Sequence, residues 1–66
     1  MATITVVADS LVRLEGFIAG VAWTNDSAIG VRSIDPDHLT AVLDDRDADG
    51  DRVWRLGPRG LEADTD

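Results

Sequence analysis

The chain has 66 residues, no cysteine, and 13 acidic against 6 basic side chains, which gives it a net charge of −7. This length allows one domain, the missing cysteine excludes disulfides and thiolate metal sites, and the negative charge argues against binding to nucleic acid or anionic membranes. The apolar content of 44% is ordinary for a globular protein and argues against a disordered chain.

The charged residues are unusual in kind, because all six basic side chains are arginine and eleven of the acidic ones are aspartate. A surface rich in aspartate and arginine and free of lysine fits a salt-rich environment, a bound cation or a basic partner. The codon usage of a GC-rich genome would produce the same composition without any specific partner. A domain this small buries little surface and usually needs a partner chain or a metal as support, so we expect a homo-oligomer. No apolar run approaches the roughly 20 residues that span a bilayer, and the N-terminus does not resemble a signal peptide. We expect the protein in a prokaryotic cytoplasm.

The first segment, 1–8, is predicted to be a strand. It is rich in β-branched residues, and Ile4, Val6 and Ala8 alternate onto one face. Asp9 and Ser10 then interrupt this alternation, and either residue can form a turn or cap a helix. A first strand followed by a break is therefore the expectation for this part of the chain.

The segment 11–23 fits two structures. As a helix, it places Leu11, Leu14 and Ile18 on one face; as a strand, its residues 12 to 15 alternate between apolar and charged. Two interior glycines each cost a helix about 1 kcal/mol, which weakens the helical interpretation. We favour at most one short helix within 10–23.

Three more apolar runs follow, at 28–34, 39–43 and 52–56. The first is stopped by Asp35-Pro36-Asp37, since proline fixes its φ angle and has no amide donor. The other two alternate on either side of an Asp-Gly step, which predicts a C-terminal β-hairpin over about 39–56.

The pattern as a whole predicts a β-rich α+β domain of four or five short strands. We expect it to occupy residues 1–60 and to be followed by a flexible acidic tail at 61–66.

The acidic run between the last two strands resembles the opening of a calcium-binding loop. Asp45, Asp47 and Asp49 alternate before a glycine, and the carbonyl of Asp51 could add a fourth oxygen. The match then fails, because the position that needs a bidentate glutamate is Leu56. Two interpretations stay open: a weak calcium site of about millimolar affinity, and a solvated turn, which we favour.

The two largest side chains of the chain are Trp23 and Trp54, and we expect both to lie in the core. Trp54 also stands between Arg52 and Arg55, where an aromatic flanked by cations could bind a partner. The alternative is that these arginines pair with the aspartates of the acidic loop. His38 is interpreted as a loop residue, because no second histidine or cysteine completes a metal site.

No motif specifies a reaction, so we expect no catalysis. The favoured function is a small acidic binding or accessory module that acts through self-association or a protein partner. A first alternative is an acidic decoy that mimics nucleic acid and occupies a basic groove on another protein. A second is a weak calcium-binding module that uses the loop from Asp45 to Asp51.

Overall fold

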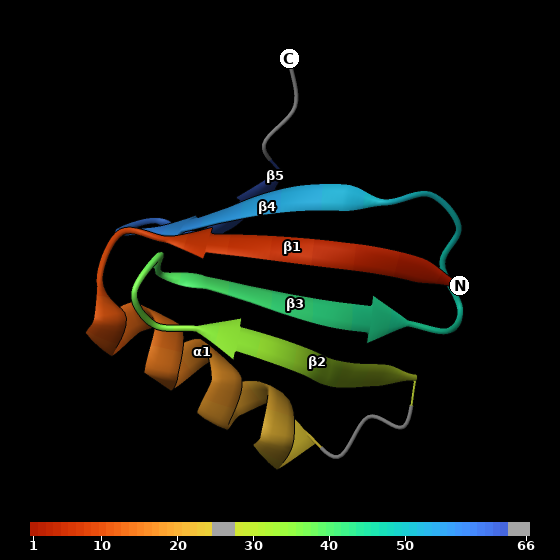
Figure 1. The fold of residues 1–66 in the computed structure, drawn as a ribbon, viewed down its shortest axis with the longest axis horizontal. Coiled ribbons are helices and arrows are strands. Elements are labelled where there is room, and N and C mark those ends of the chain that lie inside the picture. Colours follow the sequence, from red (N-terminus) through yellow and green to blue (C-terminus); the bar gives the residue numbers. More distant parts are fainter. Residues whose placement is uncertain (25–27, 64–66) are drawn as a thin grey trace.

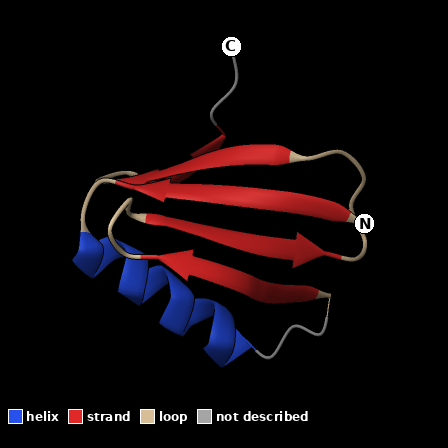
Figure 2. Ribbon diagram, in the orientation of Figure 1, coloured by secondary structure: helices blue, strands red, loops and turns tan. Residues whose placement is uncertain are grey.

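The computed structural model describes residues 1–24 and 28–63 (Figure 1). Within them lie five strands and one helix, which confirms a small β-rich α+β fold (Figure 2). The elements in chain order are β1 (Ala2–Ala8), α1 (Leu11–Thr24), β2 (Ile29–Asp35), β3 (Thr40–Asp45), β4 (Arg52–Gly57) and β5 (Gly60–Ala63).

The first strand lies at the centre of the sheet, whose order is β2-β3-β1-β4-β5. β1 is antiparallel to β3 and parallel to β4, so both of its edges are hydrogen-bonded. Val6 of β1 stands between Ala41 and Trp54 of the neighbouring strands. The strand that begins the chain therefore joins the two later hairpins into one sheet.

The prediction of a β-hairpin over 39–56 is wrong, although both of the predicted strands are present. β3 and β4 do not pair with each other, because β1 lies between them. They are two strand spacings apart, about 10 Å, and the six residues 46–51 can reach about 20 Å. The connecting loop thus passes over the start of β1. The hairpins that form are β2–β3 and β4–β5.

The prediction of a flexible acidic tail is wrong for residues 61–63, because these residues form part of β5. The turn before them has Pro58 and Arg59 at its centre, and Gly57 pairs with Gly60 across it. Gly60 has φ +99°, and Arg59 is not among the residues of positive φ. These angles fit a type I turn closed by a glycine, which returns the chain against β4. The rest of the expected tail, 64–66, lies outside the described residues.

The helical interpretation of the second segment is confirmed, and Ser10 begins the helix. The Ser10 carbonyl accepts a hydrogen bond from Leu14 N at 3.1 Å, and its side-chain oxygen accepts one from Arg13 N at 3.3 Å. This is an N-cap, and the Arg13–Asp9 ion pair of 2.7 Å supports the same turn. The cap and the apolar spacing together outweigh the cost of the two glycines.

The core is small and lies between α1 and one face of the sheet. Leu14 of α1 contacts Ala8 and Ala41 there, and Ile18, Leu39 and Leu56 pack around this cluster. Six apolar residues are buried in the described part of the chain: Ala2, Val6, Ala8, Leu14, Ala41 and Leu43. A single 14-residue helix covers only part of a five-stranded sheet, so much apolar surface remains outside this core.

Candidate interaction surface

The outward side of α1 is apolar rather than charged. Val12 is 81% exposed and Trp23 is 87% exposed. Nine residues, about two and a half helical turns, separate Trp23 from the buried Leu14, so the two side chains point in opposite directions. The expectation that Trp23 belongs to the core is therefore wrong. A helix with apolar residues on both sides is typical of one that is covered on both sides.

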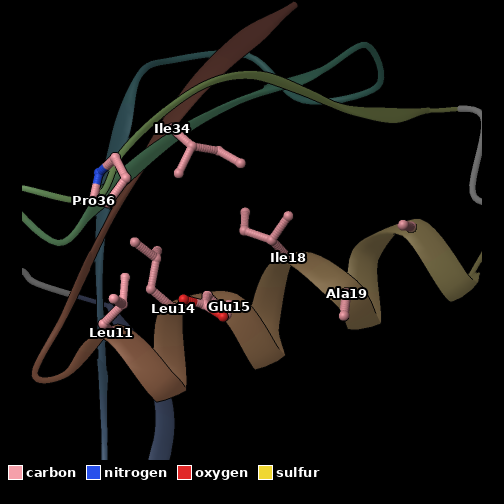
Figure 3. A pocket seen from close by; sticks show the side chains of 8 residues that line it. Leu11, Leu14, Glu15, Ile18, Ala19, Ile34 and Pro36 are labelled. Carbon is pink, nitrogen blue, oxygen red and sulfur yellow. The ribbon is translucent and has the colours of Figure 1, made fainter.

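An apolar groove of about 340 Å³ lies between α1 and the end of β2. In Figure 3, Leu14 and Ile18 point from the helix toward Ile34, which points back from β2, and Pro36 closes one end. Glu15 is the one charged residue among the lining side chains. The groove is therefore suited to apolar groups.

β2 forms one edge of the sheet, directly beside this groove. Six of its seven residues are exposed, and among the described strands it pairs with β3 alone. Its pairing shifts between Val31 and Ser33. Arg32, which lies within the shift, reaches Asp44 with an ion pair of 2.9 Å and a second contact of 3.2 Å from its Nε. Its charge is thus drawn toward β3.

Three of the four candidate calcium ligands, Asp45, Asp49 and Asp51, contact three different nitrogen atoms of the main chain. An oxygen of Asp45 accepts from Asp47 N at 3.0 Å, and an oxygen of Asp51 accepts from Thr3 N at 3.1 Å. Asp49 lies 3.4 Å from the terminal amine of Met1. In the part of the chain that the structure describes, no three acidic or histidine side chains come close enough to share a metal ion. Because the loop passes over β1, Asp49 and Asp51 contact the start of that strand.

The candidate partner-binding residues of β4 lie on two sides of the sheet. Trp54 is half-buried on the side of α1, and it borders a shallow cavity together with Arg52 and Phe17. Arg55 lies on the other side, opposite Glu62 of β5. Successive strand residues point to opposite faces, so these three side chains do not form one patch. Asp44, near the end of β3, forms an ion pair with Arg32, which the sequence did not indicate.

His38 lies in the turn between β2 and β3, as expected of a loop residue. Its Nδ1 is 2.8 Å from an oxygen of Asp35, and its backbone N donates to the other oxygen at 3.3 Å. The hydrogen bond from the His38 side chain lowers the pKa of Asp35, and the backbone bonds from His38 and Asp37 act in the same direction. The pair is exposed, and its contacts serve the turn.

Comparison of the chain with models of protein families, with curated proteins and with solved structures finds no match. In residues 1–24 and 28–63, no helix has both the length and the apolar character needed to cross a membrane. The features suited to binding are the outward side of α1, the apolar groove and the unpaired edge of β2 among the described strands.

Proposed function

We propose that this protein is an interaction module that binds another protein chain and catalyses no reaction itself. It binds through the α1–β2 surface, which we define as the outward side of α1 with Val12 and Trp23, the groove at Ile34, and the outer edge of β2. The single observation that carries the proposal is an open apolar groove that lies directly beside an unpaired edge strand of the described sheet.

The energetic support for the proposal is that the isolated chain leaves large apolar side chains exposed to water. Burying a large apolar side chain stabilises a complex by about 1.5–3 kcal/mol. Val12 and Trp23 are largely exposed and Ile34 is 47% exposed, so a partner that covers any of them gains part of that contribution, less the cost of association. An open apolar groove on an otherwise charged protein is typical of a binding site.

The acidic decoy is less well supported, because it needs carboxylates spread across one face. Asp35 ends β2 and Asp37 lies in the turn before β3, whereas the run 44–51 lies at the other end of β3. An imitation of nucleic acid would present an unbroken line of charge. The acidic groups act as a solvated rim that keeps the module in solution.

The test is affinity capture of the tagged chain from cells that produce it, after mild cross-linking. Ile34→Glu places a charge in the groove and should remove the captured polypeptide. Val53→Glu is the matched control, because Val53 is 44% exposed and Ile34 is 47% exposed, and Val53 lies on the opposite face of the sheet. Equal capture by both variants would show that the α1–β2 surface is not the binding site.

A further inference from the structure

Resting on the proposed function, we infer that the partner contributes a short extended segment that joins the edge of β2 as an additional strand. Apolar and basic side chains alternate along this segment. The apolar ones enter the groove beside Ile34, and the basic ones face away from α1. The contact uses the groove and the strand edge alone, because Val12 and Trp23 point away from the sheet and stay outside it.

The position of α1 leaves room for such a strand. In Figure 1 the C-terminal half of the helix lies beyond β2, outside the edge of the sheet rather than opposite its middle. Leu14 and Ile18 of the helix and Ile34 of β2 line the groove between the two elements. A strand added to β2 lies about 4.8 Å farther out. Its inward side chains therefore contact the helix and cover the groove.

The length of the groove fits a short extended segment. On the helix the lining runs from Leu11 to Ala22, which is about 16 Å at a rise of 1.5 Å per residue. About five residues of an extended chain span the same length. Ala19 and Ala22 are small and exposed, so they leave space for the apolar side chains of the partner.

The edge of β2 is regular where it borders the groove. Its pairing with β3 shifts between Val31 and Ser33, and such a bulge blunts an edge strand. Beyond the shift, the residues from Ser33 to Asp35 pair in register with β3, and Ile34 lies among them. Alternate residues of this stretch direct their N–H and C=O groups away from β3. Pro36, which has no N–H, ends the stretch.

The charge beside the groove favours a basic segment. The two arginines of α1 and β2 are already paired, Arg13 with Asp9 and Arg32 with Asp44. Three more carboxylates of this side form no ion pair with an arginine in the described residues, which leaves a net charge of −3: Glu15, Asp35 and Asp37. A second copy of the chain would bring the same carboxylates and be repelled here.

Asp35 gives the position of one basic side chain. It follows Ile34 in β2, so it points to the face of the sheet away from α1. A lysine or arginine of the added strand on that face lies opposite Asp35 as a cross-strand pair. The next residue along the added strand then points toward the groove. Alternation of basic and apolar residues is therefore the pattern that fits both faces.

The first test uses synthetic peptides of about five residues with blocked ends, in which lysine and valine alternate. Amide chemical shifts of the purified chain, followed by NMR in dilute buffer, should show saturable binding of the lysine peptide. A counterpart with glutamate in place of lysine should not bind. Ile34→Glu should remove the binding. Val53→Glu should keep it, because Val53 is 44% exposed and lies on the opposite face of the sheet.

The second test separates strand addition from simple apolar contact and uses the wild-type chain. Alternate residues of an extended peptide direct their N–H groups to opposite edges, so methylating either the valine or the lysine nitrogens blocks one edge only. One methylated peptide should bind about tenfold more weakly than the parent, and the other within about twofold of it. Binding should also slow amide hydrogen exchange within 33–35 and leave β5, the other edge strand of the described sheet, unchanged.

The outcomes separate this inference from the proposed function. Failure of the lysine peptide to bind, equal affinity of the two methylated peptides, or slowed exchange at β5 instead of 33–35 would overturn the added strand. Equal binding of the lysine and glutamate peptides would overturn the basic partner. In each case the interaction module stands if capture from cells still depends on Ile34. Capture and peptide binding that are both unaffected by Ile34→Glu would overturn the inference and the proposed function together.

Discussion

The turn between β2 and β3 shows how single residues hold an exposed connection in place. Asp35 accepts hydrogen bonds from both the ring and the backbone of His38. Leu39 has φ +54°, a left-handed conformation that costs a non-glycine residue about 1–2 kcal/mol. Its side chain packs against the core cluster and its carbonyl accepts from Ala8 N at 2.8 Å, and these contacts offset the cost.

From the contact between Asp35 and His38 we predict how the stability of the fold depends on pH. The pKa of Asp35 is lowered from its ordinary value of 3.8, so folding favours the ionised carboxylate. That contribution is complete above the unfolded pKa and is lost as the pH falls through the lower, folded value. At neutral pH the wild type should therefore melt at a higher temperature than Asp35→Asn, and the gap should close as the pH falls below 3.8.

The control for this prediction is Asp37→Asn, which removes one negative charge from the same turn and leaves the pair intact. Thermal melts of all three proteins across the acid range provide the comparison. A difference between wild type and Asp35→Asn that stays constant with pH would show that the pair does not contribute through its titration.

At the scale of elements, glycine has opposite roles in α1 and in the β4–β5 turn. Gly20 lies inside the helix and Gly60 closes the turn with φ +99°. A Cβ added at either position would meet nothing within 4 Å. The two sites therefore differ in backbone conformation rather than in available space.

The same substitution should change stability in opposite directions at these two positions. Gly20→Ala should raise the free energy of unfolding by about 1 kcal/mol, because alanine is the better helix former. Gly60→Ala should lower it by about 1–2 kcal/mol, because alanine is strained at a positive φ. Urea unfolding of both variants measures the two effects, and a loss of stability in Gly20→Ala would show that the helix has a neighbour at that position.

At the scale of the whole molecule, acidic side chains gather at both ends of the sheet. The run from Asp44 to Asp51 places five carboxylates at one end of the sheet, and Asp35 and Asp37 lie at the other end. Arg32 pairs with Asp44, but Asp47 has no such partner in the described residues. The remaining repulsion is opposed mainly by salt.

Stability should therefore rise with salt. We expect a higher melting temperature in molar potassium chloride than in dilute buffer, because screening relieves the self-repulsion of a net charge of −7. Asp47→Asn removes one charge from the acidic loop and should show a smaller rise than the wild type, which separates screening from the general strengthening of apolar burial by salt. An unchanged or lower melting temperature in high salt would contradict the prediction.

The sequence by itself determined most of the elements. Alternation and β-branching predicted strands at 1–8, 28–34, 39–43 and 52–56, and strands lie close to all four ranges. These signals suffice because side-chain alternation is a local property of an extended chain. β5 was missed, since four residues are too short to show alternation.

The tertiary structure alone decided how the elements combine. Two alternating runs look the same whether they pair directly or flank a third strand, so only the insertion of β1 corrected the hairpin at 39–56. That insertion also brings Asp49 to the terminal amine of Met1 and Asp51 to the backbone N of Thr3, whereas Asp45 accepts a local hydrogen bond from Asp47 N. The groove beside Ile34 and the exposure of Trp23 depend on where one helix lies on a wider sheet. Burial is set by contacts between distant segments, and no local pattern encodes those contacts.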